Sequence, residues 1–348
     1  LLAARHPDTG RMLALTLRTI VPLPATPPFH TASASYSEAF GHALTSLPGS
    51  AIELAVTLVH EARHSLLNGV SHQVRLFDTV DSPLLYAPWR TDPRPAPGLL
   101  HGAYAFAGVT EFWRTERHVL RGLEADLAHF EFAVWRDSVA VTIATLRTGG
   151  ELSRWGRRFV SRMADQAATW ADDRVPDEPR LLAEAETADR WATWRVRHLR
   201  PAENVTAELT ARWLDGGRAA RADGLSRLRS VIRAAPPEPR AELRRRHLLG
   251  SLPTTVADVT DVADLRLVRG EMAQAMDCYL DTLARDPRTR SAWVGLGLAL
   301  RHDEAPAAQS ASRALLHHPE LVRAVHLRAR ALGGVPPHPV ELATWMGR

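Results

Sequence analysis

Apolar residues recur at helical spacing through most of the chain. One clear case lies between the turn residues Pro48-Gly49 and Asn68-Gly69, where the spaced apolar positions are Ile52, Val56, Val59, Leu66 and Leu67. This period predicts an amphipathic helix. Ser50, with Glu53 three residues later, has the pattern of a capping box at its start, and Asn68-Gly69 is typical of its end. We therefore expect a helix of about five turns here.

The same spacing predicts a mainly α fold over the rest of the chain. The segment 82–97 is too rich in proline to form a helix. Residues 31–46 are small and polar enough to be either strand or loop. Further helices are expected at residues 99–117, 119–146, 151–172, 181–198, 203–215 and 219–235.

The C-terminal part resembles a tetratricopeptide repeat. Gly270, Ala275, Tyr279 and Pro287 have the spacing of the second helix of such a repeat, and the run from Trp293 to Gly297 fits the first helix of the next one. The cluster Pro236-Pro237-Glu238-Pro239 looks like a linker. We therefore expect a helical domain over residues 1–235 and a helical-repeat region over residues 240–348. That region either caps the first domain or forms a groove for a peptide.

Composition narrows the class of protein. The 348 residues are 45% hydrophobic and 24% charged, as in globular proteins, and the single cysteine, Cys278, suits a reducing compartment. All 43 basic residues are arginines, interspersed with acids to a net charge of +4, so we expect no nucleic-acid partner. No run of 18 apolar residues occurs, so we expect no membrane span and a cytoplasmic location. The chain begins without Met, which suits a fragment of a longer protein.

The candidate chemistry lies in the motif His60-Glu61-Ala62-Arg63-His64. Residues four apart on a helix share one face, so His60 and His64 can bind one metal ion through their imidazoles. Glu61 would lie beside a metal-bound water. The alternative is a pair of core histidines hydrogen-bonded to the backbone.

A third ligand is needed for a useful site. The candidates in the sequence are Asp78, Asp81, His101 and Glu111. We favour Glu111, because it shares a helix side with Tyr104 and Gly108, where a small residue would allow close approach of the first helix. His101 is the next choice.

A longer set of residues resembles a known family, the HExxH-containing peptide-modification proteins that accompany radical SAM enzymes. The resemblance covers roughly residues 20–170 and excludes the repeat-like tail. It rests on Ala39-Phe40-Gly41, His60 to His64, Tyr86-Ala87-Pro88-Trp89-Arg90, Asp92-Pro93-Arg94-Pro95, Gly98-Leu99-Leu100, Gly102, Tyr104-Ala105, Glu111-Phe112-Trp113-Arg114, Leu146-Arg147, Gly150 and Gly156-Arg157-Arg158-Phe159.

This resemblance implies a non-haem Fe(II), 2-oxoglutarate-dependent β-hydroxylase that acts on a side chain of a ribosomally made precursor peptide. His60, His64 and one carboxylate would leave three positions of an octahedral ion open for 2-oxoglutarate and dioxygen. The other carboxylate of 2-oxoglutarate needs an anchor, for which Arg94 and then Arg90 are the candidates; each has nearby acids that it could pair with instead. A radical SAM domain or protein is a further possible partner; the chain itself lacks the three-cysteine motif of such a domain.

Two other functions compete with this interpretation. The motif alone favours a zinc metallopeptidase, in which Zn²⁺ would replace iron and Glu61 would be the general base. A non-enzymatic helical scaffold would follow from the repeat-like tail. We expect the hydroxylase, because the flanking resemblance extends well beyond the motif.

Overall fold

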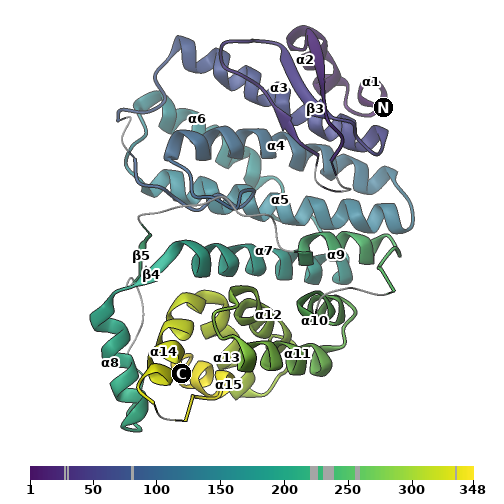
Figure 1. Ribbon diagram of the computed structural model, residues 1–348. Coiled ribbons are helices and arrows are strands. Elements are labelled where there is room, and N and C mark those ends of the chain that lie inside the picture. Colours follow the sequence, from purple (N-terminus) through teal and green to yellow (C-terminus); the bar gives the residue numbers. More distant parts are fainter. Residues whose placement is uncertain are drawn as a thin grey trace. The chain divides into compact units, whose positions relative to one another are not determined.

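The computed structural model describes residues 1–26, 29, 31–79, 82–219, 226–229, 239–254, 259–333 and 335–348. These residues are mainly helical, as the apolar spacing predicts (Figure 1). They form two compact units, which are described separately. The first comprises Leu1–Trp89 and Arg94–Glu184, and the second comprises Arg90–Pro93 and Ala185–Arg348.

The first unit combines a small sheet with a layer of long helices. Its elements are α1 (Leu2–Arg5), α2 (Pro7–Thr16), β1 (Thr19–Leu23), β2 (Ser33–Ala34), β3 (His42–Ser46), α3 (Ala51–Gln73), α4 (Ala96–Val119), α5 (Leu123–Thr148), α6 (Arg154–Ala168) and the first part of α7 (Asp177–His198). The sheet has the order β1-β3-β2, with β1 parallel and β2 antiparallel to β3. The segment 31–46, left open between strand and loop, thus contributes two strands.

The start of α3 follows the predicted cap. Ser50 Oγ accepts a hydrogen bond from the backbone N–H of Glu53 at 3.1 Å. The Glu53 carboxylate accepts from the N–H of Gly49, at 2.6 Å, one residue earlier than a standard capping box. The helix continues four residues beyond Gly69, to Gln73, because one glycine inside a helix costs only about 1 kcal/mol and the packed face continues past it.

Helix α4 lies between α3 and α5 and organises the core of this unit (Figure 1). Two glycines permit close packing on it. A Cβ at Gly108 would come within 3.0 Å of Arg63 and 3.2 Å of Val59, so Gly108 faces α3, as expected. A Cβ at Gly102 would lie 2.2 Å from the ring of Trp89, so only glycine lets that indole rest on the helix.

The second unit consists mainly of helices that follow one another along the chain. They are the last part of α7, α8 (Glu203–Leu214), α9 (Pro239–Leu248), α10 (Val259–Val268), α11 (Met272–Arg285), α12 (Arg290–Leu300), α13 (Pro306–His317), α14 (Pro319–Ala331) and α15 (Pro339–Met346), with a short antiparallel pair, β4 (Leu199–Pro201) and β5 (Ser226–Leu228). The helical-repeat prediction is confirmed for this region. A Cβ at Gly295 of α12 would lie 2.2 Å from Tyr279 of α11, so this glycine lets the two consecutive helices pack closely.

The boundary between the two compact units falls inside α7, between Glu184 and Ala185. The part of α7 in the second unit belongs to a buried ion cluster, formed by Glu186 and Asp189 of α7, Arg240 and Arg244 of α9, and Asp264 of α10. Arg240 donates to both oxygens of Asp189, at 2.8 and 2.7 Å, and to Asp264 at 2.9 Å. Arg244 donates to Glu186 and Asp189.

Two further predictions concern segments that are described only in part. Residues 226–228 form strand β5, where a helix over 219–235 was expected; the remainder of that helix, other than residues 219 and 229, lies outside the described residues. Most of the proline-rich linker 236–239 also lies outside them, and Pro239 begins α9. Among the described helices, none is long and apolar enough to cross a membrane.

Candidate metal centre

His60 and His64 meet on one face of α3. Their Nε2 atoms lie 3.0 Å apart, and their ring centroids are 4.6 Å apart with the ring planes nearly perpendicular. The helix places them here because a separation of four residues brings side chains one above the other. The backbone of α3 therefore brings the two ring nitrogens together, as the motif predicts.

Both imidazoles are neutral at pH 7. Burial lowers the pKa of His60 to about 4. Burial, with the neighbouring His60 and His101, lowers the pKa of His64 to about 3. A neutral imidazole is the form that binds a metal, because its second nitrogen then keeps a free lone pair. The site therefore presents two donors that need not lose a proton before they bind.

The pair fits a transition-metal ion in two of its positions. Two nitrogens each about 2.1 Å from one ion lie roughly 3 Å apart when they subtend an angle near 90°. The 3.0 Å separation matches this value. It also matches one neutral N–H···N hydrogen bond between the rings, so the geometry alone permits both arrangements.

An aromatic stack that was not predicted borders the pair. The ring of Phe106 lies edge-on to His60, with centroids 4.8 Å apart. Trp89 stacks on Phe106 at 5.1 Å, and Trp135 of α5 stacks on it at 4.2 Å. These rings give His60 an apolar wall. The sequence carried one signal for this stack. Gly102 and Phe106 are four residues apart on one helix, and Trp89 precedes them in the chain.

Glu61, the motif carboxylate, is buried against the sheet. It is 2% exposed, and its Oε2 atom is buried without a hydrogen-bond partner among the described residues. Burial raises the pKa of its carboxyl, an effect that Ser33 and Ser35 beside it reduce. A carboxyl in this environment is less disposed to carry the negative charge that a general base needs.

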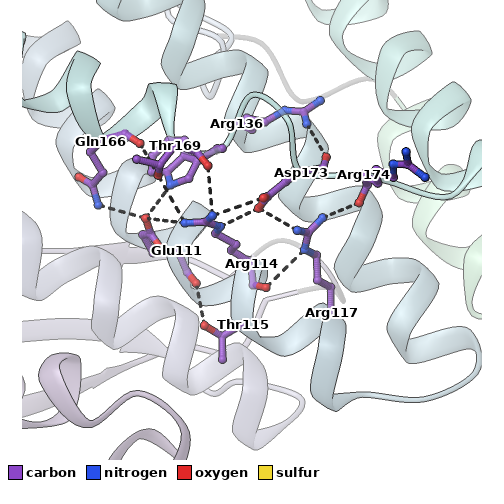
Figure 2. A network of polar contacts seen from close by, with 10 residues as sticks. Glu111, Arg114, Thr115, Arg117, Arg136, Gln166, Thr169, Asp173 and Arg174 are labelled. Carbon is purple, nitrogen blue, oxygen red and sulfur yellow. Dashed lines mark hydrogen bonds and ion pairs between the residues drawn. The ribbon is translucent and has the colours of Figure 1, made fainter.

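Glu111, the favoured third ligand, is engaged elsewhere. Its Oε1 accepts from the indole N–H of Trp170 at 2.6 Å and from Gln166 at 3.3 Å, and Arg114 lies 3.9 Å away. Figure 2 shows the carboxylate turned towards Gln166 and Arg114. Glu111 does share a helix side with Tyr104, whose ring contacts both Arg63 of α3 and Phe159 of α6. The Glu111 carboxylate lies towards α6, where it meets Gln166. The structure therefore does not bring Glu111 to the histidine pair.

His101 is the candidate that the structure does bring to the pair. Its ring stacks beside that of His64, with centroids 5.9 Å apart, and burial lowers its pKa. Ten residues separate His101 from Glu111, which is about 15 Å along the axis of α4. The two side chains therefore do not both bind the same ion. In the described part of the chain, no group of three or more histidine, cysteine or acidic side chains is arranged to hold a metal. His101 would have to turn towards the pair to do so.

The aspartate candidates add nothing to this arrangement. Asp78 is exposed, and its backbone N–H donates to the carbonyl of Glu151 at 2.9 Å. Asp81 lies outside the described residues.

The two arginines expected to anchor 2-oxoglutarate differ in their surroundings. Arg90 is exposed, belongs to the second unit and pairs with Asp92 at 2.8 Å, the alternative noted from the sequence. Arg94 is half-buried in the first unit, and its backbone forms a β-bridge with Leu85. Its Cβ and Cδ lie against Gly98, one turn before His101 on α4. Arg94 is therefore the better placed of the two within the unit that carries the histidines.

Comparison with known proteins adds no relative. No family model matches the chain, and no curated protein matches it at a significant level.

Proposed function

We propose that the chain is a metal-dependent oxygenase, in which His60 and His64 hold Fe(II) and a 2-oxoglutarate-dependent reaction hydroxylates the β-carbon of a side chain in a precursor peptide. The observation that carries the proposal is the 3.0 Å approach of two neutral imidazole nitrogens on α3. His101 is the proposed third ligand, in place of Glu111. A cytoplasmic setting suits both Fe(II) and the lone Cys278.

When bound, iron with its cosubstrate would supply the oxidation: one dioxygen and one 2-oxoglutarate become succinate, carbon dioxide and one hydroxyl group on the peptide. The chain's own residues bind and orient. Arg94 is the proposed partner of the free carboxylate of 2-oxoglutarate, because a guanidinium matches a carboxylate through two parallel hydrogen bonds. The stack of Trp89, Phe106 and Trp135 keeps water from one side of His60.

The burial of Glu61 favours this reaction over peptide hydrolysis. A peptidase needs the motif carboxylate charged and beside a metal-bound water. Glu61 instead lies against the strand segment that holds Ser33 and Ser35, with its pKa raised by burial. An oxygenase does not require a base at this position.

The test uses the full chain loaded with Fe(II) in one sample and Zn²⁺ in another. We expect the Fe(II) form to convert 2-oxoglutarate to succinate, slowly without a peptide and faster with a precursor peptide, and to add the mass of one oxygen to that peptide. His60→Ala is the negative control. Peptide fragments from the Zn²⁺ form, with no succinate from the Fe(II) form, would replace this proposal with a metallopeptidase.

A further inference from the structure

Five arginines of the second unit gather on different elements. They are Arg200 in β4, Arg229 after β5, Arg288 in the turn before α12, Arg290 at the start of α12 and Arg323 in α14, and we refer to them as the arginine cluster. Arg323 donates to the backbone carbonyl of Arg288 at 3.3 Å. The charges of Arg229, Arg288 and Arg290 repel the guanidinium group of Arg323. The charges of Arg200 and Arg290 repel that of Arg229 in the same way.

The cluster lacks carboxylate partners in the described part of the chain. None of its five guanidinium groups forms an ion pair there, and the Nε atoms of Arg229 and Arg323 are buried without a hydrogen-bond partner. The charge of Asp286 does act on Arg323. The Oδ1 atom of Asp286, however, accepts a hydrogen bond from the backbone N–H of Arg288. Burial, followed by the charges of Arg290 and Arg229, lowers the pKa of Arg323 to about 10, so it remains charged at pH 7.

The contrast with the buried ion cluster of the same unit is informative. There, Arg240 and Arg244 are buried, and each is paired with carboxylates of Glu186, Asp189 or Asp264. A buried donor left unsatisfied lowers the stability of the folded protein, and lowers it further when the donor is charged. Like charges held together add to this cost. Such an arrangement is typical of a site that an anionic ligand completes.

We propose that the arginine cluster binds the carboxylates of an acidic segment in an extended peptide. A guanidinium group has the planar fork that matches a carboxylate. The cluster spans α12, α14 and the β4–β5 pair, and stacked helical repeats commonly bind extended peptides across neighbouring repeats. The proposal depends on the proposed function only for the identity of the peptide, which would then be the precursor. The binding site itself is independent of the metal.

The experiment measures fluorescence anisotropy of a labelled peptide of alternating glutamate and glycine with the full chain at low salt. A peptide with glutamine in place of glutamate is the ligand control. We expect the glutamate peptide alone to bind, and binding to weaken as salt is added, because exposed charges are screened. Arg229→Gln, Arg290→Gln and Arg323→Gln should each weaken binding about tenfold, since each removes one charge-assisted hydrogen bond.

The matched control is Arg212→Gln on α8. Arg212 is exposed, pairs with Glu208 on the same helix, and is not among the charges that act on Arg229 or Arg323. Arg212→Gln removes the same charge as the cluster variants but outside the cluster. We therefore expect the affinity for the glutamate peptide to change by no more than about twofold. His60→Ala should bind the glutamate peptide as well as wild type does, which separates this proposal from the metal site.

Thermal unfolding supplies a second readout. Arg229→Gln and Arg323→Gln should unfold at the same temperature as wild type or higher, because each removes a repelling charge without breaking an ion pair. Equal affinity for the two peptides, full affinity in all three cluster variants, or binding of a labelled single-stranded oligonucleotide in place of the glutamate peptide would overturn the proposal. So would lower unfolding temperatures in both Arg229→Gln and Arg323→Gln, which would make their role structural.

Discussion

The Nε2 atom of His60 lies 3.0 Å from the Nε2 atom of His64, one turn further along α3. If this contact is a metal site, neither ring can be spared. We expect His60→Ala and His64→Ala each to lose the bound metal, measured by mass spectrometry of the purified protein, while the circular dichroism spectrum stays helical. The exposed His72→Ala on the same helix is the control and should keep its metal. Full metal content in both site variants would leave the contact as a hydrogen bond.

The third ligand can be assigned by comparing two variants on α4. We expect His101→Ala to lower metal content and Glu111→Ala to leave it unchanged, because Glu111 binds Trp170 and Gln166. Glu111→Ala should instead lower the free energy of unfolding by about 1–3 kcal/mol, since the indole N–H of Trp170 loses its acceptor. The opposite order of metal loss would restore Glu111 as the ligand.

Glu61→Gln distinguishes the two proposed reactions. The amide keeps the shape of the side chain and removes its charge. In a peptidase this change would remove a general base and lower the rate by about 10²–10⁴-fold. We expect the Fe(II)-loaded variant to keep most of its conversion of 2-oxoglutarate to succinate and its addition of one oxygen to the peptide. Loss of both, with wild type active, would show that this carboxyl takes part in the reaction.

Gly102 should tolerate no side chain. Gly102→Ala places a methyl group within 2.2 Å of the Trp89 ring, so we expect it to cost about 1–3 kcal/mol of stability and to displace Trp89 from Phe106. Denaturant unfolding and tryptophan fluorescence measure the two effects. Gly69→Ala is a matched helical control whose new methyl group would meet only Phe40, at 3.8 Å. It should be neutral or stabilise the protein by up to about 1 kcal/mol.

The buried ion cluster should make the second unit sensitive to acid. Burial alone would raise the pKa of Glu186, but Arg190, Arg244 and Arg245 outweigh it and lower the pKa from 4.5 to about 2. The carboxylate therefore contributes stability that is fully present above pH 4.5 and is lost as the pH falls towards 2.

Glu186→Gln tests this pH dependence. It should cost about 3–5 kcal/mol at pH 7, because Arg190 and Arg244 lose a charged partner. It should also flatten the decline in stability below pH 4.5. Thermal unfolding between pH 2 and 7 gives both results, and parallel curves for variant and wild type would contradict the assignment.

The sequence predicts local features of this protein well. The Ser50 cap and the two histidines on one face both depend on residues close together in the chain, where helical geometry fixes the neighbour. The partner of Glu111 was not predictable in this way. Trp170 lies 59 residues later, and which helix covers that side of α4 is decided by tertiary packing. The ion cluster that joins α7 to α9 was not predictable for the same reason, since Asp189 and Arg240 are 51 residues apart.

That separation also sets an order of events during synthesis. Ribosomes add roughly 5–20 residues each second, so Asp189 leaves the ribosome about 3–10 seconds before Arg240. Until then, the carboxylates of α7 have none of their α9 partners and must remain hydrated. The end of α7 that belongs to the second unit therefore cannot be buried early, and this unit completes its interior only when α9 has been made.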